Sequence, residues 1–159
     1  MKRTLMRRQV LKIVGGMALS PWSLPAASAQ ADGVEQMVAA LLAATEEGSI
    51  LQIDLEDLCH TLKLCGNSPA CFTATHHDAN KVLDACRDAL AQMPSHGVKA
   101  AVVVCSGNGK NFQLTNCAEI FRVIRLAVHE STYLVFGVVS DPTVVDAMRV
   151  SWLAGVPDG

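Results

Sequence analysis

The feature that most constrains this fold is a continuous apolar run, Ala-Ala-Val-Val-Val-Cys, within residues 99–105. An apolar run of this length, with glycines near its ends and no alternating polar residues, indicates a strand buried on both faces. Residues 132–139 form a second such run, rich in β-branched and aromatic residues. The chain therefore contains a sheet with a buried interior.

Apolar residues at helical spacing predict four helices, at 34–46, 55–65, 79–93 and 116–128. Gly48 is expected to end the first helix and Asp78 to cap the third. Asn116 with Glu119 three residues later forms a cap signature for the fourth. The remaining segments are predicted as an extended stretch at 49–54, a loop at 66–77, a short helix near 143–147 and a third strand at 149–154.

The order strand, helix, strand between residues 99 and 139 is a crossover unit, which is expected to be parallel and right-handed. The last strand follows after a short connection and is expected to run antiparallel. Together these elements predict an α/β fold, a two-layer sandwich with a small mixed sheet and helices.

The N-terminus is typical of a secretory signal. Arg7-Arg8 is followed by Gln-Val-Leu-Lys, which is similar to the twin-arginine export motif Ser/Thr-Arg-Arg-x-Phe-Leu-Lys, although Met6 and Val10 depart from it. An uncharged apolar segment follows at 13–24. The sequence therefore predicts a twin-arginine signal peptide at 1–29 and export to the periplasm or the cell exterior.

Cleavage after Ala29 fits the small-x-small rule, and cleavage after Ala31 fits nearly as well. An amphipathic N-terminal helix of the folded domain is the alternative, and the two prolines and the glycine pair between residues 15 and 25 disfavour it. The apolar segment is too short to span a bilayer, so we expect no integral membrane segment after cleavage. Residues 30–159 then form one domain.

The charge of that domain is acidic. The 159 residues include 13 lysines and arginines and 15 aspartates and glutamates, and five of the basic residues precede residue 13. The rest of the chain carries eight basic against fifteen acidic side chains, a net charge of −7. Nucleic acids and anionic membranes are bound through positive surfaces, so neither is expected as a partner.

Two segments resemble the C-terminal domain of the tubulin/FtsZ family. Residues 133–142 read Tyr-Leu-Val-Phe-Gly-Val-Val-Ser-Asp-Pro, and residues 148–155 read Met-Arg-Val-Ser-Trp-Leu-Ala-Gly. The family pattern is a strand ending in Phe-Gly or Ile-Gly, an Asp-Pro, and then Arg-Val-Thr-x-x-Ala-Thr-Gly. Residues 48–58 are similar to the FtsZ synergy loop, Gly-x-x-Asn-x-Asp-Phe-Ala-Asp-Val, with Gln52 in place of the asparagine.

The resemblance covers about residues 33–159 and leaves out the half that binds GTP in the family. Residues 106–110, Ser-Gly-Asn-Gly-Lys, follow a strand but lack the length of a phosphate-binding loop, so we interpret them as a turn. No cofactor is predicted.

Asp54 and Asp57 match the two synergy-loop carboxylates. In the family these carboxylates enter the nucleotide pocket of the next subunit and polarise the attacking water, so the resemblance gives them, with Gln52, a role only on a partner's nucleotide site. The residues themselves favour a simpler interpretation. Asp54 would cap the helix at 55–65. Asp57, in the first turn, would interact favourably with the positive N-terminal end of the helix dipole.

Six cysteines follow the signal, and an even number in an exported domain suggests disulfides. Six cysteines allow fifteen pairings. The expected pairs are Cys65–Cys71 across the loop, Cys59–Cys86 between helices, and Cys105–Cys117. Buried free thiols are an equally weighted alternative, because twin-arginine substrates fold first in a reducing compartment.

A metal site is a weaker hypothesis, for which Cys71, His76 and His77 are the candidates. Adjacent histidines in a polar loop are more often solvated, and the cysteine spacing fits no standard zinc or cluster motif. No metal is therefore predicted.

These observations predict an exported, non-enzymatic binding or assembly module without GTPase activity, which acts through a protein partner or self-association. One alternative is a cytoplasmic modulator of an FtsZ-like GTPase, which keeps its N-terminus and docks through residues 48–58. A second alternative is a periplasmic metal or redox protein that uses the cysteines and histidines.

Overall fold

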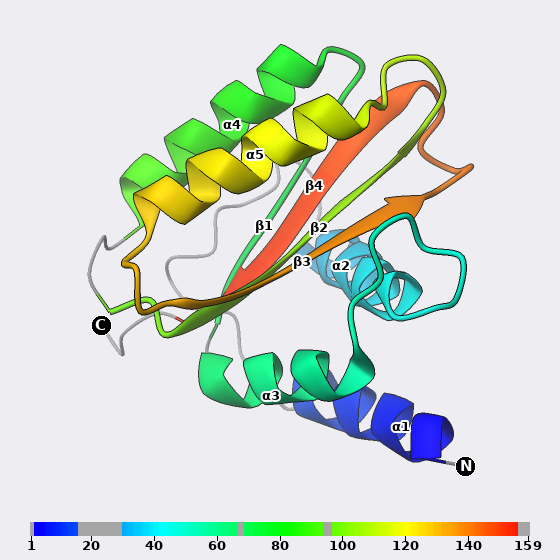
Figure 1. Ribbon diagram of the computed structural model, residues 1–159, viewed down its shortest axis with the longest axis vertical. Helices are drawn as coiled ribbons and strands as arrows, with labels where there is room; N and C mark the ends of the chain where they lie inside the picture. Colours follow the sequence, from blue (N-terminus) through cyan, green and yellow to red (C-terminus); the bar gives the residue numbers. More distant parts are fainter. Residues whose placement is uncertain (1, 16–29, 67–68, 94–96, 156–159) are drawn as a thin grey trace.

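A four-stranded mixed sheet forms the centre of the protein (Figure 1). The computed structural model describes residues 2–15, 30–66, 69–93 and 97–155. The strands are β1 (Ala70–His76), β2 (Ala100–Asn108), β3 (Tyr133–Ser140) and β4 (Ala147–Ala154), in the order β1-β4-β2-β3. β2 and β3 are parallel, and β4 is antiparallel to both β2 and β1. The predicted parallel crossover and antiparallel last strand are confirmed.

Helices cover both faces of this sheet (Figure 1). On one face lie α4 (Ala79–Gln92) and α5 (Leu114–Ala127), and with the sheet they make the predicted α/β sandwich. The other face carries α1 (Lys2–Gly15), α2 (Gln30–Ala44) and α3 (Leu55–Cys65). The core is accordingly divided by the sheet into two apolar clusters.

β2 belongs to both clusters, as its unbroken apolar sequence predicts. Val102 and Val104 point to the α1–α3 face, whereas Val103 and Cys105 point to the α4–α5 face. All four side chains are fully buried. Successive side chains of a strand point to opposite faces, so only a strand with cover on both sides needs apolar residues at every position.

The segment predicted as a loop at 66–77 is instead the edge strand β1, and the loop prediction was wrong. β1 pairs with β4 along its whole length, from Ala70 opposite Ala154 to His76 opposite Met148. The stacked rings of Phe72 and Trp152, with centroids 4.2 Å apart, lie across this pair. Threonines and histidines give the segment a polar composition, and only pairing with a distant strand makes it extended.

Other predicted helices also differ from the structure. α2 begins at Gln30 and ends at Ala44, whereas the sequence predicted a helix at 34–46. α5 begins at Leu114, and its N-cap residue Gln113 makes no side-chain cap hydrogen bond. Glu119 does not complete a capping box, because its carboxylate is 2.6 Å from the guanidinium of Arg122 one turn later. Residues 143–146 form turns rather than the short helix predicted near 143–147, and Ala147 begins β4. Asp141 holds the first turn by accepting from the Thr143 amide and hydroxyl. By contrast, the helices at 55–65 and 79–92 lie where the sequence predicted them, with Asp54 and Asp78 as caps.

The extended stretch predicted at 49–54 makes only an isolated bridge, between Leu51 and Val138. Residues 106–108, predicted as part of a turn, continue β2, and the turn begins at Gly109 with a φ of +84°.

The N-terminal segment contains a helix, α1, which packs against α3. The prolines and most of the apolar segment of the predicted signal fall within 16–29, outside the described residues. Among the residues that are described, no helix is long and apolar enough to cross a membrane.

Gly155 should not tolerate a side chain, because β4 ends against the end of α3 there. A Cβ at this position would lie 2.6 Å from the Cα of Cys65 and 3.1 Å from the Leu64 carbonyl oxygen. Both are backbone atoms, which cannot move aside as a flexible side chain could. We expect Gly155→Ala to lower the free energy of unfolding by about 1–3 kcal/mol. Urea titration followed by circular dichroism would measure the change.

The control is Leu126→Ala, which shortens a side chain that is 72% exposed and should change the stability by less than about 0.5 kcal/mol. Equal stability of the Gly155→Ala variant and the wild type would contradict this account of the β4–α3 contact.

Candidate functional site

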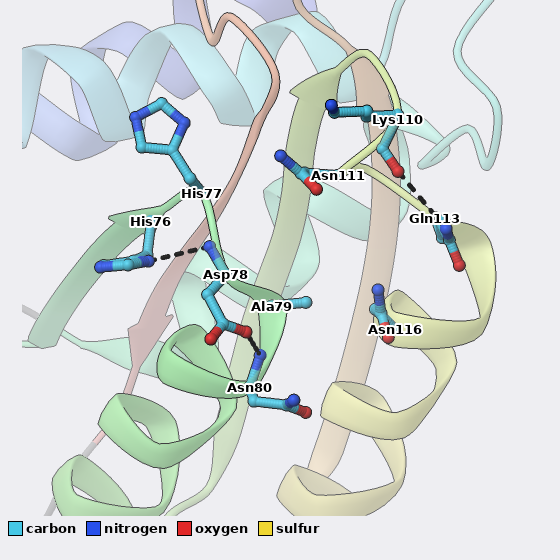
Figure 2. A pocket seen from close by; sticks show the side chains of 9 residues that line it. All are labelled: His76, His77, Asp78, Ala79, Asn80, Lys110, Asn111, Gln113 and Asn116. Atoms are coloured by element: carbon cyan, nitrogen blue, oxygen red, sulfur yellow. Dashed lines mark hydrogen bonds between the residues drawn. The ribbon is translucent and has the colours of Figure 1, made fainter.

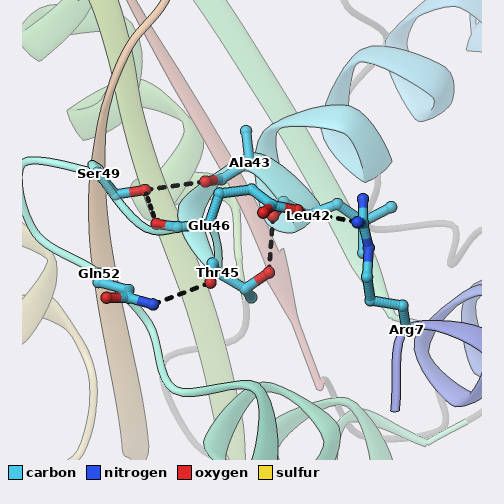
Figure 3. Close-up of polar contacts among 7 residues, drawn as sticks. All are labelled: Arg7, Leu42, Ala43, Thr45, Glu46, Ser49 and Gln52. Atoms are coloured by element: carbon cyan, nitrogen blue, oxygen red, sulfur yellow. Dashed lines mark hydrogen bonds and ion pairs between the residues drawn. The ribbon is translucent and has the colours of Figure 1, made fainter. Parts of the chain in front are cut away.

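The segment 48–58, whose sequence resembles the synergy loop, runs from the turn after α2 to the first turn of α3. Side chains close the turn after α2 (Figure 3). The Thr45 hydroxyl donates to the Leu42 carbonyl at 2.7 Å, and the Ser49 hydroxyl lies 2.9 Å from the carbonyls of both Ala43 and Glu46. Gly48 then turns the chain with a φ of +90°, which glycine adopts at little cost.

Three contacts fix the segment to the sheet and to α2. Leu51 and Val138 exchange both backbone hydrogen bonds, at 3.1 and 3.0 Å. The Ile53 amide donates to the Ala44 carbonyl at 2.8 Å, and its side chain is buried. The Gln52 side-chain amide donates to the Thr45 carbonyl at 3.0 Å (Figure 3). The Gln52 side chain therefore helps to fix the segment against the end of α2.

The two carboxylates have different local roles. Asp54 is the N-cap of α3, and its side chain accepts from the Glu56 amide at 2.7 Å. Asp57 lies in the first turn of the helix and accepts from the Tyr133 hydroxyl at 3.4 Å. The Tyr133 ring also meets the edge of His60, with centroids 5.2 Å apart. The interpretation of Asp54 as a cap thus agrees with its geometry.

Tyr133 is a member of this site that the sequence analysis missed. It is the only tyrosine in the chain and lies 76 residues beyond Asp57. No local pattern links two such positions; only the register of β3 brings them together. Partial burial raises the pKa of the Tyr133 phenol, and the neighbouring Asp57 carboxylate raises it further by disfavouring a second negative charge.

The outer surface of the segment combines apolar and acidic side chains. Ile50 and Leu51 are about half exposed, at 48% and 46%, although both belong to a segment whose backbone is fixed. Asp54, Glu56 and Asp57 are exposed beside them. Exposed apolar residues rimmed by polar ones are typical of protein interaction sites.

A polar pocket of about 410 Å³ lies at another place, between the start of α4 and the turn that precedes α5 (Figure 2). Its lining includes His76, His77, Lys110 and Asn116. His76 accepts from the Asp78 amide through Nδ1 at 2.8 Å, so its Nε2 carries the proton in the neutral ring. The Nδ1 of His77 is 3.1 Å from the Asp146 carbonyl, to which it can only donate.

The structure does not bring the proposed metal ligands together. Cys71 and His76 lie five residues apart along the extended strand β1, which places their backbones about 16 Å apart. The rings of His76 and His77 have centroids 6.3 Å apart. Among the described residues no group of three histidine, cysteine or acidic side chains is placed to hold a metal.

All six cysteines lie in the described part of the chain, and all are free. The three expected disulfides are not formed, and the structure agrees with the equally weighted alternative of free thiols. Cys59 and Cys86 lie in the two core clusters on opposite faces of the sheet, which separates them. The Cys65 thiol instead donates to the Ala100 carbonyl at 3.6 Å. Burial raises the pKa of Cys65 and of Cys86 to about 12, so both are thiols rather than thiolates at neutral pH.

Cys105 and Cys117 do meet, as a hydrogen-bonded pair of thiols rather than as a disulfide. Cys105 is the donor: its hydrogen bond to Cys117, together with burial, raises the pKa of Cys105, and the same bond lowers the pKa of Cys117.

The fold is that of the tubulin/FtsZ class. FtsZ from M. jannaschii superposes with a TM-score of 0.63 at 14% identity, over 95% of this chain and 45% of FtsZ. An empty FtsZ dimer from the same organism gives 0.61 at 15% identity, over 93% of this chain and 43% of that one. CetZ1 from Haloferax volcanii, a GDP-bound monomer, superposes with a TM-score of 0.53 at 16% identity, over 86% of this chain and 43% of CetZ1.

This chain thus spans less than half the length of the solved proteins it matches. No protein-family model and no curated protein sequence matches it. At these identities the likeness establishes the fold alone.

The contact between Asp57 and Tyr133 can be tested directly, because the chain has a single tyrosine. Asp57→Asn removes the negative charge that disfavours the phenolate, so we expect the pKa of Tyr133 to fall toward its ordinary value. A titration followed by the ultraviolet absorbance of the phenolate would measure it.

Glu56→Gln is the matched control, because it neutralises the adjacent carboxylate, whereas Asp57 is the carboxylate that raises the pKa of the phenol. The same pKa shift in both variants would show that the Asp57–Tyr133 contact is not specific.

Proposed function

We propose that this protein is a non-enzymatic binding or assembly module that docks through residues 48–58, and that its working part is exported. The observation that carries the proposal is the exposure of Ile50 and Leu51 on a backbone fixed by the Leu51–Val138 bridge. A segment that is already ordered loses little conformational entropy when it binds, so its apolar side chains contribute more of their burial to affinity.

The chemistry of the segment supports docking rather than catalysis. The Asp54 carboxylate is engaged as a helix cap, and Asp57 accepts from Tyr133. A general base must be within hydrogen-bond reach of the proton it removes, in a site that positions the substrate. The matched FtsZ and CetZ chains are more than twice as long as the part that this protein covers. GTPase activity by this chain alone is therefore not expected.

Self-association is the form of docking that the neighbours favour. The solved structures that share this fold include an FtsZ dimer and a protofilament of CetZ2 from Haloferax volcanii with bound GTPγS, the latter at a TM-score of 0.51. An acidic and apolar surface such as that of residues 48–58 would pair with a surface that offers apolar contact and basic groups.

Export rests on the N-terminal sequence. The twin-arginine pair, the uncharged apolar segment and the small-x-small site occur in the order that a signal peptide requires. The net charge of −7 after residue 12 suits a soluble exported domain.

A second function is favoured by α1. The side chain of Val10 is fully buried in the cluster that contains α2 and α3. A helix that belongs to the fold fits a cytoplasmic modulator that keeps its N-terminus and docks through the same residues 48–58 onto an FtsZ-like GTPase.

The docking role of residues 48–58 predicts that a charge at Ile50 weakens assembly. We expect the wild-type protein to self-associate in sedimentation experiments as its concentration rises. Ile50→Glu should weaken this association by about tenfold or more, since an interface then has to bury a charge. Leu126→Glu adds the same charge at a residue that is 72% exposed on α5 and should have no effect.

A protein that stays monomeric at all concentrations would refute self-assembly. Turnover of GTP by the purified protein, measured as phosphate release, would refute the non-enzymatic proposal.

The two candidate functions predict different native N-termini. Mass spectrometry of protein isolated from its own cells should find a chain that begins at Gln30 or Asp32 if the signal is cleaved as proposed. Recovery of intact chains only, with Met1 or its immediate successor at the N-terminus, would exclude the exported module and leave the modulator.

A further inference from the structure

The N-terminal helix α1 is docked against α3, and one of its faces is part of the core. Met6 and Val10 are four residues apart, so they lie on the same side of the helix. Val10 is fully buried and Met6 packs against the same cluster, whereas the neighbouring Leu11 is 50% exposed. α1 therefore has a defined inner face, although half of its residues are basic or polar.

Two polar contacts hold the same face of α1. The guanidinium of Arg7 is 3.1 Å from the Glu46 carboxylate, in the turn that follows α2 (Figure 3). The Cys59 thiol of α3 points to the Met6 carbonyl at 3.9 Å. Arg7 and Arg8 are both exposed, and Arg7 differs in that its guanidinium pairs with Glu46.

We infer that α1 and the α3 surface beneath it mask each other: docking engages Arg7 with Glu46 and shields the Cys59 side of α3, and a receptor that binds both arginines competes with Glu46 for Arg7 and so weakens the docking of α1. Among the side chains that the structure describes, this contact includes a buried valine, a partly buried methionine, the Cys59–Met6 contact and an exposed ion pair. An exposed ion pair adds little stability, so we expect the contact to be reversible. An isolated helix of 14 residues is marginal in water, and displaced α1 therefore also loses helical structure.

The masking is reciprocal as a matter of thermodynamic linkage. A receptor that captures Arg7 shifts the equilibrium toward the undocked state, and that state exposes the α3 surface to a partner. Conversely, a ligand that occupies the α3 surface releases the arginine pair. Only the identity of the receptor rests on the proposed export. The docking of α1 on α3 is independent of that proposal.

Cys59 reports on this equilibrium because its side chain is only 6% exposed beneath α1. Burial raises the pKa of its thiol, and undocking removes that burial, so a larger thiolate fraction reacts. The test is alkylation of the purified full-length chain with iodoacetamide, with each cysteine followed by mass spectrometry. Cys86, fully buried on the opposite face of the sheet, is the internal control for global unfolding.

Val10→Asp should increase the rate of Cys59 alkylation by about tenfold or more, because a charge is excluded from the apolar contact. Leu11→Asp is the matched control, with the same substitution one residue away on the exposed side, and should leave the rate unchanged. The rate at Cys86 should stay low in both variants.

Arg7→Gln and Arg8→Gln form a second, milder pair. An exposed ion pair is worth little, so Arg7→Gln should raise the Cys59 rate by about two- to fivefold, and Arg8→Gln should not. If Val10→Asp also raises the alkylation rate of Cys86, that variant unfolds globally, and the comparison of Arg7→Gln with Arg8→Gln then provides the test. Equal rates in all four variants, or a wild-type rate equal to that of the denatured chain, would overturn the inference. Neither result depends on export or assembly.

Discussion

The burial of β2 on both faces is the interaction on which the rest of the structure depends. Because β2 pairs with β3 on one side and β4 on the other, its hydrogen bonds set the register of three of the four strands. Its alternate side chains also supply the centre of both apolar clusters. Removing either helical layer would expose the β2 side chains that face it, so the two layers are linked through one strand.

The candidate docking surface depends on the same sheet. β3 carries Gly137 opposite Val104 of β2, and a side chain at Gly137 would lie 2.9 Å from both Ala44 and Ile53. The absence of a Cβ lets the chain after α2 approach β3 closely, and the Ile53 side chain fills that position. Residues 48–58 are therefore held in place by packing, while Ile50 and Leu51 remain half exposed. A fixed backbone with exposed apolar side chains is what a preorganised binding segment requires.

The same helical layer also binds the N-terminal helix. α1 contacts α3 and the turn after α2, so the segment with the export-like motif lies on the face of the sheet that carries residues 48–58 (Figure 1). This arrangement relates the two proposed functions to each other. In the proposed mutual masking, a docked N-terminus covers the Cys59 side of α3, and an undocked N-terminus leaves that side available to a partner.

The sequence by itself determined the elements whose apolar pattern is complete: β2, β3 and the helices at 55–65 and 79–92, with the caps Asp54 and Asp78. Such patterns are local, because a buried strand or an amphipathic helix needs the right residues within a short window. Only the tertiary structure decided that the segment from Ala70 to His76 is a strand, that Tyr133 meets Asp57, and that the cysteines stay apart or unbonded. These features depend on partners dozens of residues away, whose positions are set by strand register and by the two faces of the sheet.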